Sequence, residues 1–295
     1  MDTPYQRIHV IINPAAGGNR PVLSILNRVF RQHGVHWEVS VTNQAGDGRR
    51  LAREAAAAGV DLVAVYGGDG TLMEVAGGLA GSGVPLAYLP GGTGNVMAAE
   101  LGISRRLVRS ARLIFAESHR LRPLDLGRIG DCYFLMRASV GFEAVVARRT
   151  SRELKERFGL LAYGITIVQS LGEPLLARYS LNLDGQTVEA EGFSLLIANS
   201  GHIGRLNLLL STTIRPDDGW LDVMVLSAPP DYMRSLAISA ARLDEVAASL
   251  QHWKARTVAV IADPPQSVQA DGDWIGQTPI TAVIEPEAVR ILVPG

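Results

Sequence analysis

Two glycine-rich segments contain the residues whose types and spacing could bind a phosphate group. The segment Gly67-Gly68-Asp69-Gly70-Thr71 follows an apolar run at residues 62–66 and opens an amphipathic segment. Glycines let the backbone approach a ligand closely, and the amides at the start of a helix attract phosphate. A carboxylate in such a loop, Asp69, predicts a divalent cation beside the phosphate. The alternative is a tight turn in which Asp69 caps the helix that follows it.

The second glycine-rich segment, Pro90-Gly91-Gly92-Thr93-Gly94-Asn95, also follows an apolar run, and Thr93 could donate its hydroxyl to a phosphate oxygen. Residues 13–18 and 42–48 form two further loops that follow predicted strands. The carboxyl ends of parallel strands meet at one edge of a sheet, where ligands of open α/β sheets bind. Four such loops therefore predict a nucleotide-phosphate site at that edge.

Composition excludes several other classes of protein. The 295 residues include 28 Lys and Arg against 29 Asp and Glu, and a net charge of −1 argues against a protein that wraps nucleic acid. The only lysines are Lys155 and Lys254, and no Gly-Lys-Ser/Thr sequence forms a Walker-type loop. The single cysteine, Cys132, excludes a disulfide framework within the chain. Without a signal peptide or a long apolar run, the chain is expected to be cytoplasmic.

Alternating strand and helix patterns occupy the first 120 residues. Apolar runs predict strands at residues 8–12, 37–41, 62–66 and 84–89. Helical spacing predicts helices at residues 22–30, 48–58, 72–79 and 105–117. This alternation predicts a three-layer α/β domain with a mainly parallel sheet, which we assign to residues 1–122.

The pattern changes after residue 122 to strands joined by short turns. Asp184-Gly185 lies between two alternating segments and predicts a tight hairpin. Further strands are predicted at residues 193–198, 221–226, 258–262 and 280–284, and helices at residues 150–172 and 231–253. Residues 123–295 are therefore expected to form an antiparallel β-sandwich, whose last residues could return to the first domain.

Motifs along nearly the whole chain resemble those of one known family. They are Asn13-Pro14-x-x-Gly17, the loop at 67–71 followed by Glu74, Gly92-Thr93-Gly94-Asn95, Asp218-Gly219-Trp220-Leu221-Asp222 and Ala270-Asp271-Gly272-Asp273. Together and in this order, they resemble the diacylglycerol and sphingosine kinase catalytic family, and most closely its bacterial soluble lipid kinases. The Gly-Gly-Asp-Gly loop alone is shared with NAD kinases and phosphofructokinases.

The resemblance implies ATP, Mg²⁺ and transfer of the γ-phosphoryl group to a lipid hydroxyl. The residues expected to bind the nucleotide are Asn13, Thr42, Gly67, Gly68, Asp69, Gly70, Thr71, Leu72, Met73, Gly92 and Thr93. A structural Mg²⁺ would be held by the Asp218 side chain and the carbonyls of Arg215 and Trp220, hard oxygen ligands that suit this ion. Asp69 would organise the Mg²⁺–ATP complex, and Asp273 would be the general base.

Three positions depart from the family pattern. Asp273 stands where the family has Glu, Val96 where many members have Asp, and Ala99 where many have Arg. Two alternatives are therefore kept, a nucleotide- or lipid-binding protein with weak or no catalysis and an NAD kinase-like enzyme. The expected partner is a lipid at the inner face of a membrane, contacted through basic residues 148–157 and apolar residues 158–163. The oligomeric state stays open, with a homodimer among the alternatives.

Overall fold

The structure is a computed structural model that describes residues 4–141, 176–203, 208–209, 213–227 and 250–295. It divides into two units. The first unit contains Met1–Leu126, Ser200–Asp218 and Glu285–Gly295, and the second contains Gly127–Asn199 and Gly219–Ile284. Among the described residues, no helix combines the length and the apolar character that a membrane span requires.

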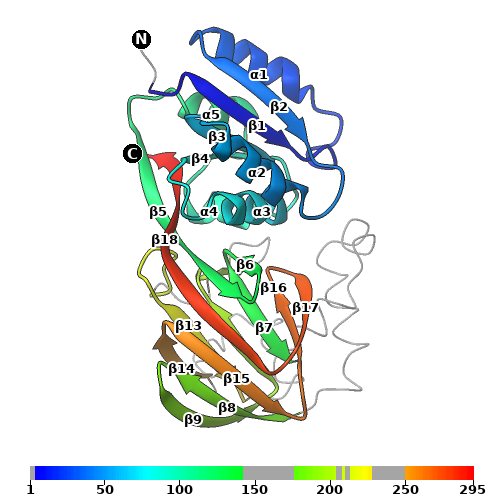
Figure 1. The fold of residues 1–295 in the computed structure, drawn as a ribbon, viewed down its shortest axis with the longest axis vertical. Helices are drawn as coiled ribbons and strands as arrows, with labels where there is room; N and C mark the ends of the chain where they lie inside the picture. The colour runs from blue at the N-terminus through cyan, green and yellow to red at the C-terminus, as the bar shows by residue number, and fades with distance from the viewer. Residues whose placement is uncertain (1–3, 142–175, 204–207, 210–212, 228–249) are drawn as a thin grey trace. The chain divides into compact units, whose positions relative to one another are not determined.

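A parallel sheet forms the centre of the first unit (Figure 1). Its strands are β1 (Arg7–Ile12), β2 (His36–Val41), β3 (Leu62–Gly67) and β4 (Leu86–Pro90), in the order β2-β1-β3-β4. The last part of β18 (Ile280–Pro294) extends this sheet, since Ile291 pairs in parallel with Leu86. Every residue of β3 is buried, as expected for a central strand covered on both faces.

Helices cover both faces of this sheet. Helix α1 (Val22–Arg31) and helix α5 (Leu107–Leu113) pack through Leu26, Phe30 and Ala111 against one face. Helices α2 (Asp47–Ala57) and α3 (Asp69–Leu79) pack closely together, because a Cβ at Gly78 would lie 2.7 Å from the Ala52 Cβ. A short helix, α4 (Val96–Glu100), follows β4. The expected three-layer α/β arrangement is confirmed.

Two antiparallel sheets form the second unit. One contains β15 (Thr257–Asp263), β8 (Ala177–Leu183), β9 (Gln186–Gly192) and the first part of β18. The other has the order β14-β13-β10-β7-β16-β17. Its strands are β14 (Leu250–Ala255), β13 (Leu221–Leu226), β10 (Ser194–Ala198), β7 (Arg137–Gly141), β16 (Ser267–Ala270) and β17 (Asp273–Gln277). Buried side chains of both sheets share one core, which confirms the expected β-sandwich class.

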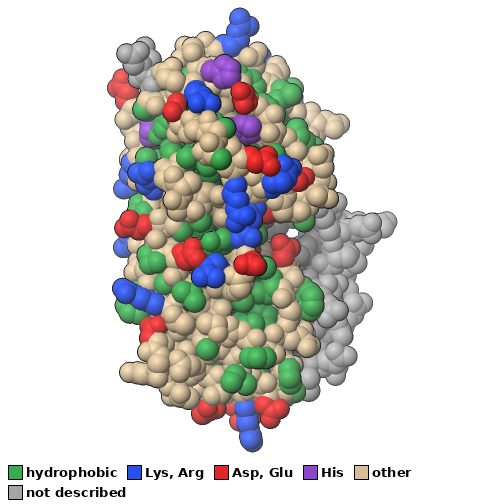
Figure 2. Space-filling model, in the orientation of Figure 1, with side chains coloured by type: hydrophobic (Ala, Val, Ile, Leu, Met, Phe, Trp, Pro, Cys, Tyr) green, Lys and Arg blue, Asp and Glu red, His purple; other side chains and the backbone are tan. Residues whose placement is uncertain are grey.

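The remaining described strands are short or join the others. Strand β5 (His119–Ile129) forms a hairpin with β6 (Cys132–Phe134), and β11 (His202–Ile203) pairs with β12 (Leu208–Leu209). On the face that Figure 2 shows, basic and acidic side chains of the described residues are interspersed. This mixture agrees with the nearly neutral net charge of the sequence.

Two Asp-Gly turns join neighbouring strands of the second unit. Asp184 and Gly185 have φ angles of 50° and 93°, and Asp271 and Gly272 have φ angles of 47° and 99°. Positive φ at both central residues is the requirement of a type I′ turn, whose twist matches that of the flanking strands. The hairpin expected at 184–185 is confirmed by the pairing of β8 with β9.

The structure corrects some expectations about single elements. The helix predicted at residues 231–253 is wrong at its described end, because residues 250–253 belong to strand β14. Residues 142–175, which include the predicted membrane-contact segment and the helix at 150–172, lie outside the described residues. Helix α5 is shorter than predicted, and the short strands β16 and β17 were not predicted.

Candidate active site

The loops predicted to bind phosphate follow four neighbouring parallel strands. Strand register places Ile12 of β1 beside Val41 of β2 on one side and beside Tyr66 of β3 on the other. Gly67 at the end of β3 pairs in turn with Pro90 at the end of β4. The loops after these strands therefore share one edge of the sheet, as the sequence predicts.

The two glycine-rich loops are in direct contact. The amides of Gly91 and Gly92 donate hydrogen bonds of 2.8 and 3.2 Å to the Gly67 carbonyl. A Cβ at Gly92 would lie 2.6 Å from the Cα of Gly68, so a larger residue would push the loops apart. Glycine at this position therefore lets the two loop backbones approach each other closely.

Asp69 links the same two loops through its carboxylate. Its oxygens accept hydrogen bonds of 3.0 and 3.1 Å from the amides of Val96 and Met97, at the start of helix α4. The N-cap of helix α3 is Gly68 and shows no side-chain capping bond, so the alternative that Asp69 caps its own helix is wrong. Burial raises the pKa of Asp69, although both amides lower it. Asp69 therefore caps helix α4, which follows the second glycine-rich loop.

Asn13 and Thr71, both predicted to bind the nucleotide, contact each other. The Asn13 Nδ2 atom donates a 2.8 Å hydrogen bond to the Thr71 hydroxyl, and its Oδ1 atom accepts one of 3.0 Å from the Ala15 amide. The side chain of Leu72 is fully buried, so only its backbone could contact a ligand at this edge. Two other predicted residues differ in exposure: Met73 is half-buried and Thr93 is exposed.

Glu74 positions the loop that contains the predicted nucleotide ligand Thr42. Its two carboxylate oxygens accept hydrogen bonds of 2.9 Å each from the amides of Gly46 and Gly48. The motif in the sequence includes Glu74, but it does not indicate this role. Its partners lie more than twenty residues earlier in the chain.

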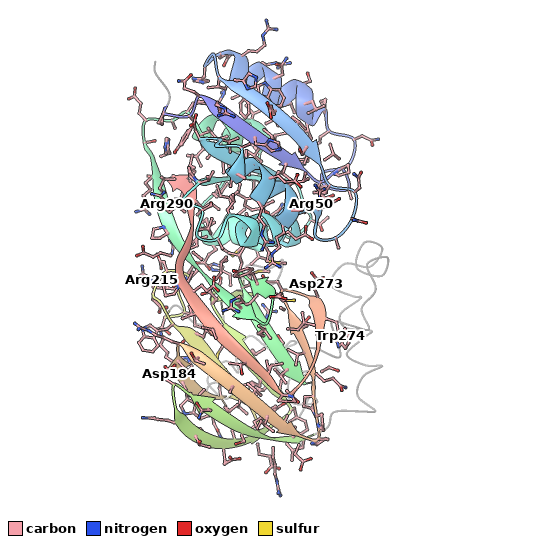
Figure 3. The ribbon with its side chains drawn as sticks, viewed as in Figure 1. Arg50, Asp184, Arg215, Asp273, Trp274 and Arg290 are labelled. Atoms are coloured by element: carbon pink, nitrogen blue, oxygen red, sulfur yellow. The ribbon has the colours of Figure 1, made fainter. Side chains whose placement is uncertain are left out.

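Asp47, the first residue of helix α2, also stabilises the loop between β2 and α2. Its carboxylate accepts hydrogen bonds from the amides of Asn43 and Gln44 and from the Arg50 guanidinium, which Figure 3 labels on α2. The Arg50 bond and the two amides lower the pKa of Asp47 to about 2. The β2–α2 loop is therefore held by two carboxylates, Asp47 and Glu74.

Asn95 shapes the second glycine-rich loop and was not predicted as a site residue. It has a left-handed φ of 50°, which Asn tolerates better than most residues. Its side chain donates to the Gly92 carbonyl at 2.6 Å and accepts from the Tyr88 hydroxyl at 3.1 Å. The bond to Gly92 lies only three residues away in the chain, so a local turn signal at Asn95 could have revealed it.

Asp273, the predicted general base, lies in the second unit at the start of strand β17 (Figure 3). It is exposed and pairs with Ala270 across the Asp271-Gly272 turn. The Asp271 carboxylate accepts hydrogen bonds of 2.6, 3.0 and 2.9 Å from the amides of residues 135, 136 and 137. Burial raises the pKa of Asp271 to about 6, although these amides lower it. Asp271 thus anchors the turn and leaves the Asp273 carboxylate exposed.

The predicted metal ligands Arg215, Asp218 and Trp220 lie in the turn that precedes strand β13. Asp218 is half-buried. A carboxylate with backbone carbonyls is a hard oxygen donor set, so these residues fit Mg²⁺ in their chemistry. Among the described residues, His, Cys, Asp and Glu form no group of three or more that could hold a metal ion.

Asp217 and Asp125 brace this turn from the first unit. Asp217 accepts hydrogen bonds of 2.9 and 3.2 Å from the guanidinium groups of Arg122 and Arg215. Burial raises the pKa of Asp217, but the two guanidinium groups outweigh it and the pKa is lowered. The Asp125 amide donates to the Pro216 carbonyl at 2.7 Å, and its buried carboxylate accepts the Glu287 amide at 2.8 Å. Asp125 was not predicted, although a carboxylate between two strand leucines is a visible signal.

Asp222 ends the motif that starts at Asp218, and it forms a buried ion pair in the second unit. Its carboxylate is completely buried and lies 2.6 Å from the His252 Nε2 atom and 3.7 Å from the Lys254 ammonium. A buried carboxylate requires such partners, because desolvation penalises an isolated charge. This arrangement indicates a structural role for Asp222 within β13 and β14.

The first unit thus combines a parallel sheet covered by helices with two glycine-rich loops in contact at the carboxyl ends of its strands. Residues 7–129 match the diacylglycerol kinase catalytic domain family, and residues 136–293 match the YegS C-terminal NAD kinase beta sandwich-like domain family. The chain therefore belongs to the diacylglycerol kinase-like family of lipid kinases.

Relatives match over nearly the full length of the chain. A Pseudomonas aeruginosa protein named "Probable lipid kinase YegS-like" is 31% identical, covering 98% of this chain and 95% of its own. A Bacillus subtilis protein named diacylglycerol kinase is 27% identical over 98% of this chain and 97% of its own.

Solved structures share the fold. A crystal structure of a diacylglycerol kinase from Bacillus anthracis has a TM-score of 0.75 at 21% identity, covering 99% of this chain and 98% of that one. A second structure from the same organism has a TM-score of 0.83 at 24% identity, covering 99% and 97%. At these identities the similarity shows the fold alone.

Proposed function

We propose that the protein is an ATP- and Mg²⁺-dependent kinase that phosphorylates the hydroxyl of a lipid. The observation that carries this proposal is the contact between the glycine loops after β3 and β4, which Asp69 joins at the edge of the sheet. The backbone amides at the start of helix α3, which is 11 residues long, form a suitable site for the phosphates of a nucleotide. Membership of a lipid kinase family supports the same reaction.

The chain's own residues would divide the work of phosphoryl transfer. The amides of residues 67–71 and 93 would bind the phosphates of ATP, and Gly92 would hold the two glycine loops together. The bond between Asn13 and Thr71 would fix the start of helix α3 beside the loop after β1. Mg²⁺, when bound, would neutralise charge on the phosphate oxygens. Asp69 would hold the ion of the ATP complex, and Asp218 with the carbonyls of Arg215 and Trp220 would hold a structural ion.

Asp273 would accept the proton of the lipid hydroxyl. The hydroxyl oxygen would form the new bond to the γ-phosphorus, while the bond from that phosphorus to the β–γ bridging oxygen breaks and ADP leaves. The Asp273 carboxylate is exposed, and Asp271 fixes the turn that precedes it, so a substrate can approach a base of defined position. Positioned bases of this kind contribute about 10²–10⁴-fold to a rate.

The acceptor would be met at the surface of a membrane, because a lipid hydroxyl lies at the interface between hydrocarbon and water. The family supports a lipid acceptor, and the acceptors to compare are diacylglycerol, monoacylglycerol, phosphatidylglycerol, sphingoid bases and ceramide. A cytoplasmic enzyme acting at the inner face of a membrane is the corresponding proposal for its location.

The decisive experiment is an assay of label transfer from γ-labelled ATP to a panel of these lipids in mixed micelles with Mg²⁺. Wild type would be compared with Asp273→Ala, Asp273→Glu and Glu189→Ala, an exposed carboxylate on strand β9 that serves as the control. We expect label in one lipid class with wild type and Glu189→Ala. With Asp273→Ala, transfer should fall by about 10² or more.

Each other outcome changes the proposal in a defined way. When NAD replaces the lipids in the same assay, label in NAD and in no lipid would indicate an NAD kinase-like enzyme. Label only with Asp273→Glu would show that the shorter carboxylate limits transfer. Binding of ATP without transfer by any variant would indicate a binding protein and overturn the kinase proposal.

A further inference from the structure

Arg105, an exposed residue between helices α4 and α5, reaches back to the second glycine-rich loop. Its Nη2 atom donates a 2.8 Å hydrogen bond to the carbonyl of Gly94. Ile103 and Leu107 are buried and fix the backbone on either side of Arg105. The guanidinium is therefore held at the loop by a defined bond, although the two residues lie 11 positions apart in the chain.

Gly94 also contacts the carboxylate of Asp69. A Cβ at Gly94 would lie 3.2 Å from the Asp69 Oδ2 atom, so the backbone of this glycine packs against the carboxylate. Burial raises the pKa of Asp69, whereas the amides at the start of helix α4 and the positive charge of Arg105 lower it. The guanidinium therefore acts on the same side chain that would hold the metal ion of the nucleotide complex.

Several amides of the second glycine-rich loop and of helix α4 are already paired within the protein. Those of Gly91 and Gly92 donate to the Gly67 carbonyl, and those at the start of α4 donate to Asp69. A nucleoside triphosphate would bring several negative charges to a site that already contains the Asp69 carboxylate. A cation besides Mg²⁺ would therefore stabilise the bound phosphates, because amides alone only partly offset this charge.

Arg105 is well suited to supply this charge. The first 154 residues contain no lysine, and Arg50 beside the β2–α2 loop is already bonded to Asp47 and Glu54. Residues 101–116 include no Asp or Glu, so no acidic neighbour in that segment competes for Arg105. Its bond to a neutral carbonyl uses one N–H of the planar guanidinium, and the others can bind phosphate oxygens in the bidentate manner.

We propose that Arg105 binds the terminal phosphates of the nucleotide and so makes the site selective for a triphosphate. The bond to Gly94 would hold the guanidinium beside the loop, and its remaining N–H groups would bind the β- and γ-phosphate oxygens. This inference rests on the proposed function for the nucleotide site and adds a residue that determines its specificity. A monophosphate would not reach this contact, so its binding would not depend on Arg105.

Calorimetric titration of the full chain with ATP, ADP and AMP in the presence of Mg²⁺ tests the proposal. Wild type would be compared with Arg105→Gln, Arg105→Lys and Arg106→Gln, the control, which removes the same charge from the adjacent exposed residue. We expect Arg105→Gln to weaken ATP binding about tenfold or more and to leave AMP binding unchanged. Arg105→Lys should recover part of the loss, and Arg106→Gln should bind all three nucleotides like wild type.

Two results with the nucleotides would overturn the proposal. Equal weakening of ATP, ADP and AMP by Arg105→Gln would show that the residue only supports the loop through Gly94. Equal losses for Arg105→Gln and Arg106→Gln would show a general effect of surface charge.

Failure of the proposed function gives different results. If wild type binds ATP but transfers no phosphoryl group, the kinase proposal fails and the titrations still decide the role of Arg105. If wild type binds no nucleotide, tripolyphosphate with Mg²⁺ is titrated in the same way. Binding of tripolyphosphate that Arg105→Gln weakens and Arg106→Gln does not would support the proposal, and absence of binding would overturn it.

Discussion

Asp69 and Asp273, the two carboxylates predicted to be catalytic, occupy opposite kinds of environment. Asp69 is half-buried and bonded to the amides of Val96 and Met97, so one side chain would both hold the loops and serve the reaction. Asp273 is exposed, and the neighbouring Asp271 holds the turn instead. Under the proposed function, positioning and chemistry would share one residue in the first unit and would be divided between two residues in the second.

The largest effect on stability is therefore expected at Asp271 and not at Asp273. Asp271→Ala leaves three backbone amides without their acceptor, and we expect the free energy of unfolding to fall by about 3–5 kcal/mol. Urea denaturation of this variant beside Asp273→Ala measures the difference. Asp273→Ala should unfold like wild type.

Asp184→Ala is the matched control, since Asp184 occupies the equivalent position of the other Asp-Gly turn and its exposed carboxylate accepts the amides of residues 256 and 257. It should lose about 1 kcal/mol. Equal losses for the two turns would contradict a special anchoring role of Asp271.

The raised pKa of Asp271 predicts an effect of pH on stability. The unfolded chain releases this proton near pH 4 and the folded chain near pH 6, because burial raises the pKa of the folded state. The contribution is fully present below about pH 4 and is lost as the pH rises through about 6, by about 3 kcal/mol in total. Unfolding curves from pH 4 to 7 for wild type and Asp271→Asn measure it. An identical pH dependence in the two proteins would contradict the prediction.

Asp69→Asn should affect stability and activity together. The amide side chain can accept only one of the two backbone bonds and places a donor against the other. We expect the free energy of unfolding to fall by about 1–3 kcal/mol, and transfer from labelled ATP to fall with it. Loss of transfer with unchanged stability would show that Asp69 does not join the glycine loops in solution.

Glu74→Gln should have the smallest effect and sharpens the contrast within the first unit. One of the two bonds to Gly46 and Gly48 is lost at a partly exposed position, so we expect about 0.5–1.5 kcal/mol. Because the loop with Thr42 is displaced and no reacting group is changed, the KM for ATP should rise several-fold at constant kcat. A lower kcat at constant KM would assign Glu74 a direct part in the reaction.

The periodic elements of the first unit could be predicted because local patterns define them. The strands at 8–12 and 62–66 and the helix at 22–30 follow from apolar spacing and glycine or proline ends, and the structure has them within a few residues. Strands β16 and β17 were missed because each is short, and the pattern around them is more polar than that of a buried strand.

The contacts that build the site could not be predicted from local patterns. Asp69 bonds to amides 27 and 28 residues later in the chain, and Asp271 to amides more than 130 residues earlier. Such pairs depend on the tertiary fold. In the sequence, Asp273 is the residue that departs from the family motif. In the structure, Asp271 is the residue whose carboxylate accepts three backbone amides.

Strand β18 has a consequence for the synthesis of the protein. Its residues Glu285–Gly295 belong to the first unit, where Ile291 pairs with Leu86 of β4, but the ribosome makes them after everything else in that unit. Until they emerge, the β4 side of a nearly complete sheet lacks this partner, and unpaired strand edges promote association with other chains. The nascent first unit therefore depends on strand β18, and slow translation of the second-unit segments at residues 127–199 and 219–284 would prolong the exposure of this sheet edge to aggregation.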